Sequence, residues 1–145
     1  MVETVRIIVI WDGKVLLLKK AKNSNNPDML ELPGGKIEDQ PLQSAIRELE
    51  EETSISLSED SLNKLSYEKV YTFDYHGVKT TRIVYYYYAF LNEKPSVSIN
   101  GTTDIDGKPE DKHQSYEWVD ISELQYLQTL AENSKIDIYL LRNLS

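Results

Sequence analysis

Residues 41–53, PLQSAIRELEEET, constrain the fold of this chain more than any other segment. Apolar residues recur there at helical spacing and predict a helix with one buried face. This buried stripe comprises Leu42, Ala45, Ile46, Leu49 and Thr53. Pro41 suits the first helical position, where a backbone N–H is not required. We therefore expect an amphipathic helix over residues 41–53, packed against a core.

The second half of this predicted helix carries a dense group of charges. Residues 47–52, RELEEE, contain four carboxylates and one guanidinium. Glu48, Glu51 and Glu52 are three or four positions apart, so we expect them to repel one another on one face, away from the apolar stripe. They also lie near the negative end of the helix dipole. A divalent cation would offset this cost, and a solvated acidic face is the simpler alternative.

Strands are predicted on both sides of the helix, from β-branched and aromatic residues between turn signals. They comprise residues 4–11, 15–20, 65–73, 78–91 and 116–119. Asp12-Gly13 predicts a tight hairpin between the first two. Pro33 stops any helix before the acidic one, and Gly34 and Gly35 allow a backbone group to approach a ligand closely, although such a pair also occurs in simple turns.

The second half of the chain holds three further features. Residues 85–88 are four tyrosines, two on each face of a strand, and we favour packing of the sheet over the alternative of stacking on a nucleobase. Residues 93–114 are predicted to be a long polar loop, and His76 and His113 to be turn or loop residues rather than metal ligands. Residues 120–123 are typical of a capping box, and helical spacing continues to residue 140.

Composition excludes several classes of function. The length of 145 residues predicts one domain over residues 1–145, and the lack of cysteine excludes disulfides and thiolate metal sites. A net charge of −8, with no basic run beyond residues 19–20, argues against nucleic acid and anionic membranes as partners. The sequence shows neither a signal peptide nor a spanning apolar segment. We therefore expect a soluble cytoplasmic protein, as a monomer or homodimer.

Residues 32–55 resemble the Nudix box. LPGGKIE at residues 32–38 is similar to its first part, and the Arg-Glu-aliphatic-x-Glu-Glu half matches residues 47–52 in full. The leading hairpin, the long later strand and EWVD at residues 117–120 also look MutT-like. The resemblance implies an α/β Nudix fold, in which a central mixed β-sheet is sandwiched between α-helices.

Two positions depart from the Nudix signature. The segment after Gly35 is two residues short, and its acid is Asp39 rather than Glu, so we expect altered loop geometry but an intact catalytic helix. Ser54 stands where the signature has Gly. A helix end there often requires a left-handed residue, so Ser costs about 1 kcal/mol.

The resemblance implies a site for Mg²⁺, or Mn²⁺, held by carboxylate oxygens. Glu51 and Glu52 are the implied metal ligands. Glu48 is implied as a ligand or the general base, oriented by Arg47. The carbonyl of Gly34 would complete the coordination.

Two further sets of site residues are implied. MutT-like members carry an acid before the last strand, and the position counted back from the closing tryptophan holds Lys112. We favour Asp111 as the acidic metal ligand, with Glu110 and then Glu117 as alternatives. Lys19 and Lys20 match a basic pair that contacts substrate phosphates, although strand alternation lets only one of them face the site.

The implied function is Mg²⁺-dependent hydrolysis of a nucleoside diphosphate linked to another moiety, through water activated by the metal. We favour a nucleoside triphosphate, including oxidised purine forms, giving the monophosphate and pyrophosphate. ADP-ribose, a nucleotide sugar and a dinucleoside polyphosphate are the alternative substrates. A non-catalytic Nudix-fold ligand sensor is less favoured, because it predicts loss of box carboxylates that are all present. A plain structural domain would show no Mg²⁺ dependence.

Overall fold

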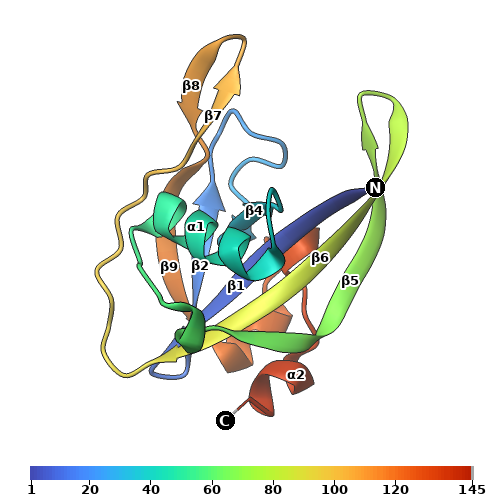
Figure 1. Ribbon diagram of the computed structural model, residues 1–145. Coiled ribbons are helices and arrows are strands. Elements are labelled where there is room, and N and C mark those ends of the chain that lie inside the picture. Colours follow the sequence, from blue (N-terminus) through green and yellow to red (C-terminus); the bar gives the residue numbers. More distant parts are fainter. Residues whose placement is uncertain (145) are drawn as a thin grey trace.

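A mixed, seven-stranded β-sheet forms the centre of the computed structural model, which describes residues 1–144 (Figure 1). The strand order is β3-β2-β1-β6-β5, with β4 paired to β1 and β9 paired to β2. These strands are β1 (Val2–Trp11), β2 (Lys14–Lys20), β3 (Leu30–Glu31), β4 (Gly34–Lys36), β5 (Asn63–Tyr75), β6 (Val78–Leu91) and β9 (His113–Asp120).

Strand β1 lies inside the sheet and pairs in parallel with β6, from Val2 opposite Arg82 to Trp11 opposite Leu91. It pairs with β2 only where the two meet at their hairpin. Beyond that point β1 and β2 diverge, since β3 pairs with β2 while β4 pairs with β1. The chain over residues 30–36 therefore lies between the diverging strands β1 and β2 and places Gly34 beside β1, inside the sheet.

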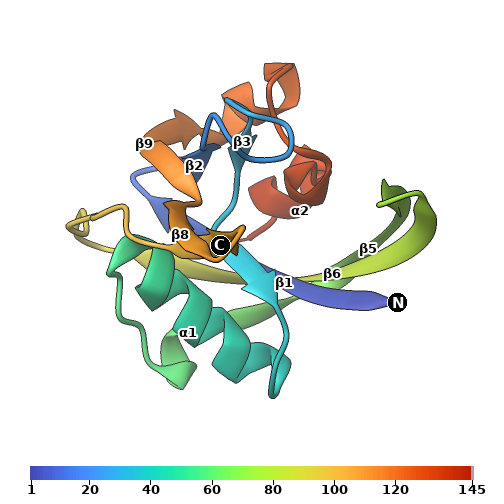
Figure 2. The same ribbon diagram turned by 90° about the horizontal axis from the view of Figure 1, so that it is seen from above.

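Helices cover both faces of the sheet (Figure 2). Helix α1 (Pro41–Thr53) lies on one face, and the 3₁₀ turns η2 (Ile121–Tyr126) and η3 (Glu132–Ser134) with helix α2 (Ile138–Arg142) lie on the other. Alternation along β1 sends Val5, Ile7 and Val9 to the α1 face and Ile8 and Ile10 to the opposite core. This arrangement confirms an α/β fold with a mixed sheet between helices.

Several local predictions are confirmed. Helix α1 begins at Pro41 and ends at Thr53, and Ser54 after it adopts the left-handed conformation with φ 65° and ψ 14°. Both predicted hairpins are present. Tyr86 and Tyr88 pack on one face of the sheet, and Tyr85 and Tyr87 on the other. Packing therefore accounts for all four rings.

Other predictions were wrong. The region expected to be a continuous polar loop contains a hairpin of β7 (Thr102–Ile105) and β8 (Lys108–Asp111), which projects from the body (Figure 1). The expected capping box is absent, because the Asp120 side chain makes no cap bond and a 3₁₀ turn follows it. The C-terminal helical pattern is divided between η2, the 3₁₀ turn η3 and the short helix α2. Within the described residues, no helix has the length and apolar character that crossing a membrane demands.

Candidate active site

The acidic half of α1 faces the protein interior more than its spacing predicted. Glu48 and Glu52 are only 6% and 2% exposed, whereas Glu50 and Glu51 are exposed. The expectation that Glu48 and Glu52 point away from the buried face was wrong. The bend at Pro33 and the first two residues of β4, Gly34 and Gly35, which we call the glycine turn, lie against that side of the helix. The buried face of the helix is therefore wider than the apolar stripe.

The two glycines contact these two carboxylates. The Gly34 N–H donates a hydrogen bond of 2.9 Å to Glu52 Oε1, and a Cβ on Gly34 would overlap the carbonyl oxygen of Val5. A Cβ on Gly35 would lie 2.6 Å from the carboxyl carbon of Glu48. Close approach therefore requires glycine at both positions, and the turn forms a cradle for the acids. A metal contact through the Gly34 carbonyl stays a prediction.

Arg47 bridges the loop and the helix. Its Nη1 lies 3.4 Å from Glu38 Oε2 and 3.6 Å from Glu48 Oε1. The acid that Arg47 meets in the shortened loop is therefore Glu38, while Asp39 is exposed. This geometry is what an orienting role for Arg47 requires.

Burial outweighs the positive charges beside the two acids. Burial, and next the neighbouring charge of Glu52, raise the pKa of Glu48 to about 7, against Lys112 and Arg47, which lower it. Burial also raises the pKa of Glu52. Glu48 Oε2 is buried and has no hydrogen-bond partner. Hard carboxylate oxygens of this kind suit a divalent cation. Over residues 1–144, no three His, Asp or Glu side chains are already grouped at metal-binding distance.

A distant segment covers the C-terminal end of α1. The N–H groups of Ser98, Asn100 and Gly101 donate to the carbonyls of Thr53, Glu52 and Glu51, respectively, at 3.0, 3.2 and 3.2 Å. These bonds satisfy terminal carbonyls and offset the negative end of the helix dipole. Sequence reasoning missed this segment, because a polar loop carries no local sign of which helix it will reach.

The junction between β8 and β9 brings a lysine to the acids. Lys112 Nζ lies 3.6 Å from Glu52 Oε2. Asp111, the favoured downstream acid, is exposed on β8 and pairs with Thr102. Of these two neighbours, Lys112 is thus the residue that contacts the buried carboxylate, and metal binding by Asp111 stays a prediction.

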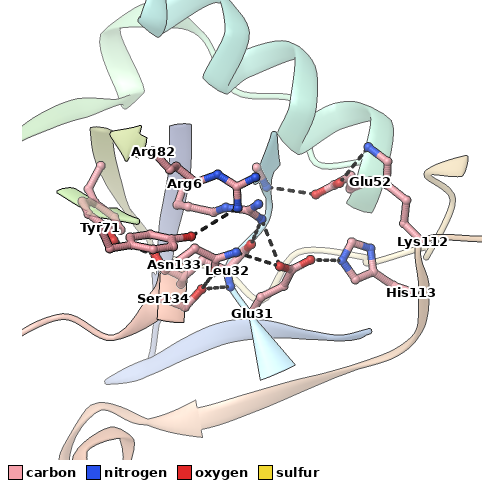
Figure 3. Close-up of polar contacts among 12 residues, drawn as sticks. Arg6, Glu31, Leu32, Glu52, Tyr71, Arg82, Lys112, His113, Asn133 and Ser134 are labelled. Carbon is pink, nitrogen blue, oxygen red and sulfur yellow. Dashed lines mark hydrogen bonds and ion pairs between the residues drawn. The ribbon is translucent and has the colours of Figure 1, made fainter. Parts of the chain in front are cut away.

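A second polar cluster lies where strands β1 and β2 diverge (Figure 3). Glu31 accepts hydrogen bonds from His113 Nε2 at 2.7 Å and Asn133 Nδ2 at 3.1 Å, and lies 3.5 Å from Arg6 Nη1. Burial alone would raise the pKa of Glu31, but Arg6, the His113 hydrogen bond and Lys20 hold it well below its ordinary value. His113 is therefore a buried strand residue, and its assignment to a loop was wrong.

Sequence reasoning missed this cluster, although one signal was available. Arg6 and Glu31 are charged residues within short apolar segments, Val5 to Ile10 and Leu30 to Leu32, where burial is expected. Their partners come from the end of the chain, since Ser134 Oγ accepts from the Leu32 N–H and Tyr86 donates to the Asn133 carbonyl. The cluster joins β1, β3, β6, β9 and η3.

The two candidate phosphate-binding lysines, Lys19 and Lys20, have different surroundings. Burial lowers the pKa of Lys20, and its charged neighbours are Glu31, Arg6 and Arg82. Lys19 instead acts electrostatically on Asp28 in the loop after β2. Lys20 is thus the lysine beside the second cluster, and the expectation that only one of the pair faces the substrate site stays a prediction.

The projecting end of the β5–β6 hairpin adds an aromatic surface beside Arg82. The Arg82 guanidinium lies 4.4 Å from the ring centre of Phe73 and donates a 3.2 Å hydrogen bond to Tyr71 Oη. Both rings are partly exposed, and Arg82 Nε has no hydrogen-bond partner. This surface can offer stacking and positive charge together.

Comparison with known proteins places this geometry in a family. A family model described as NUDIX domain matches residues 2–142. No curated protein sequence matches the chain.

Solved structures share the fold. A MutT protein from Methanosarcina mazei Go1 is 21% identical with a TM-score of 0.67, and the match covers 90% of this chain and 84% of that one. An Ap4A hydrolase from C. elegans is 21% identical with a TM-score of 0.66, covering 98% and 93%. The NUDIX domain of Shewanella oneidensis NrtR, complexed with ADP ribose, is 19% identical with a TM-score of 0.69, covering 98% and 86%. At these identities the likeness shows the fold alone.

Proposed function

Since this chain belongs to the NUDIX domain family, whose enzymes are pyrophosphohydrolases, we propose that α1 and the glycine turn hydrolyse a phosphoanhydride in a nucleoside diphosphate linked to another moiety. One observation carries the proposal. Glu48 and Glu52, buried side by side on one helix face, leave Glu48 Oε2 without a hydrogen-bond partner beside the Gly35 backbone.

The proposed cofactor is Mg²⁺, with Mn²⁺ as the alternative. The donor set fits such an ion, because two neighbouring buried carboxylates repel each other and offer hard oxygen ligands. Glu52, the exposed Glu51 and the Gly34 carbonyl would hold it, and Glu48 would be a further ligand or the general base. When bound, the ion activates water and neutralises phosphate charge. Asp111 remains a candidate ligand from the neighbouring hairpin.

The roles of the protein groups follow from their contacts. Glu48 is the proposed general base, because its free oxygen can accept a proton from water. Arg47 orients Glu48 through their 3.6 Å contact. Lys20 is better placed than Lys19 to meet substrate phosphates, since it lies among the charges of the second cluster. Tyr71 and Phe73 offer ring faces for a nucleobase.

The substrate we favour is a nucleoside triphosphate, including oxidised purine forms, converted to the monophosphate and pyrophosphate. ADP-ribose, a nucleotide sugar and a dinucleoside polyphosphate are the alternatives. The whole of residues 1–145 is proposed to act as one domain, which the extent of the family match supports. A cytoplasmic monomer or homodimer acting on small molecules, rather than on nucleic acid, is consistent with the net charge of −8.

A hydrolysis screen over these nucleotides, in which chromatography resolves the nucleoside monophosphate product, tests the proposal. We expect turnover of at least one substrate with Mg²⁺ and its loss in EDTA. The double variant Glu51→Gln/Glu52→Gln should lose at least about 100-fold in rate, because it removes metal ligands. Glu50→Gln is the matched control, since Glu50 is an exposed acid of the same helix. No turnover on any substrate, or equal turnover in the double variant, would contradict the proposal, and metal-independent ligand binding would favour a sensor.

A further inference from the structure

Lys112 extends a positive charge from the surface to a buried acid. Its Nζ lies 3.6 Å from Glu52 Oε2, and its side chain is 33% exposed while that of Glu52 is 2% exposed. Among the residues that the structure describes, Lys112 is the only cation within ion-pair distance of Glu52. Arg47 and Arg6 are engaged with Glu48 and Glu31 instead. Glu52 thus depends on Lys112 for its direct charge partner.

The backbone around Lys112 is held while its side chain keeps a path to solvent. The Lys112 N–H donates to the Gly101 carbonyl, and the Lys112 carbonyl accepts from the Ala21 N–H, both at 3.0 Å. A Cβ on Gly101 would lie 3.2 Å from Glu52 Cγ and 3.6 Å from Lys112 Cδ, so a glycine lets these side chains pass close to each other. A fixed backbone and a flexible stem allow the ammonium to change partner without movement of the fold.

A divalent cation and the Lys112 ammonium would compete for the same carboxylate. An ion bound by Glu52 repels an ammonium within a few ångströms of it. Released from Glu52, the ammonium would still lie at the edge of the same site, and an ammonium binds phosphate oxygens as a compact charge with three donors. The two positions of this side chain therefore suit two states of the site.

We propose that Lys112 is a movable counter-ion, which neutralises Glu52 in the metal-free protein and turns to the phosphate oxygens of the nucleotide when a divalent cation binds Glu52. This inference rests on the proposed function of the α1 site. Its consequence is coupling, because metal binding alone must displace Lys112, whereas metal binding with nucleotide gives Lys112 a new partner. Metal and nucleotide should therefore each strengthen binding of the other.

The test measures binding rather than turnover. Free Mn²⁺ is titrated by electron paramagnetic resonance with the full chain, alone and with a nucleoside triphosphate whose reacting bridge oxygen is replaced by a methylene group. In Lys112→Met the affinity for Mn²⁺ alone should rise roughly tenfold, and the affinity for the nucleotide at saturating Mn²⁺ should fall by a similar factor. Lys108→Met is the matched control, because Lys108 is an exposed lysine of β8, the strand that leads into Lys112. Lys112→Gln is the second variant if Lys112→Met does not fold.

Opposite changes in the affinities for Mn²⁺ alone and for the nucleotide, present in Lys112→Met and absent from Lys108→Met, support the movable counter-ion. Equal affinities in Lys112→Met and Lys108→Met overturn it, and so does a parallel loss of both affinities, which a purely structural ion pair predicts. A separate result bears on the proposed function itself. If the unmodified protein binds no Mn²⁺, or if Glu52→Gln binds Mn²⁺ equally well, the metal site on α1 fails, and the role of Lys112 fails with it.

Discussion

The backbone N–H of Gly34 donates a 2.9 Å hydrogen bond to Oε1 of Glu52, a carboxylate that is almost completely buried. The bond joins the turn after β3 to the end of α1. A carboxylate in this position stabilises the turn. The turn also supplies one of the few hydrogen-bond donors that the carboxylate has. The loop and the helix of the proposed site therefore form one structural unit.

Gly35→Ala should lower kcat by about 10- to 100-fold, because a Cβ 2.6 Å from the Glu48 carboxyl group displaces the proposed base. Steady-state kinetics on the substrate found in the screen would measure the effect. Gly107→Ala at the exposed tip of the β7–β8 hairpin is the control. A φ of 79° strains alanine there, but its Cβ meets no atom within 4 Å, so the strain stays in the hairpin tip and does not move Glu48. An unchanged kcat in Gly35→Ala would show that the position of Glu48 does not matter for the reaction.

Arg47→Met should reduce kcat by about tenfold or more while KM changes little, because Glu48 loses the group that orients it. Glu38→Gln should have a smaller effect, since the contact between Arg47 and Glu48 remains. Measurement of kcat and KM for both variants separates the two contacts. A larger loss in Glu38→Gln would mean that Arg47 acts on the loop rather than on Glu48.

Glu31→Gln should destabilise the protein by about 3–5 kcal/mol at neutral pH, because it leaves the buried Arg6 without its acid. The folded pKa of Glu31 lies below its unfolded value near 4.5. The stabilisation is therefore fully present above pH 4.5 and is lost as pH falls toward the folded pKa. Urea unfolding from pH 7 to pH 3 should show the difference in stability between the two proteins become smaller below pH 4.5, beside the exposed control Glu93→Gln. A difference independent of pH would exclude this linkage.

Ser54→Gly should increase the free energy of unfolding by about 0.5–1 kcal/mol, since glycine adopts the left-handed conformation at φ 65° without steric cost. Ser54 also accepts a hydrogen bond of 2.6 Å from Asn100 Nδ2 at the surface. Asn100→Ala removes that bond alone and gives its contribution in the same urea titration. A loss of stability in Ser54→Gly larger than in Asn100→Ala would contradict the prediction.

The local elements were predictable because they depend on neighbours in the chain. Apolar spacing and Pro41 predicted both ends of α1, and Asp12-Gly13 predicted the first hairpin. The match to the Nudix box predicted the family and, with it, the mixed sheet between helices. The left-handed conformation after α1 was also expected, although a serine occupies it.

The surroundings of the acids were not predictable in this way. Helical spacing placed Glu48 and Glu52 away from the core, but β4 packs beside that face and buries them. The two strands of the β7–β8 hairpin are short and lie in a polar segment. They therefore show no alternation of apolar and polar residues from which they could be predicted. The contact between Glu31 and His113 joins residues 82 positions apart, and no local pattern reports such a pair.

The sequence by itself determined the helix, its carboxylates, the glycine turn and the family, because periodicity, turn residues and motif spacing are all read along the chain. Only the tertiary structure decided that two of these carboxylates are buried, that backbone donors from residues 98–101 meet their helix end, and that Lys112 contacts Glu52. These relationships depend on which distant segments become neighbours where β1 and β2 diverge and where α1 packs on the sheet. Packing of the whole core determines which segments become neighbours, and no single stretch of sequence carries that information.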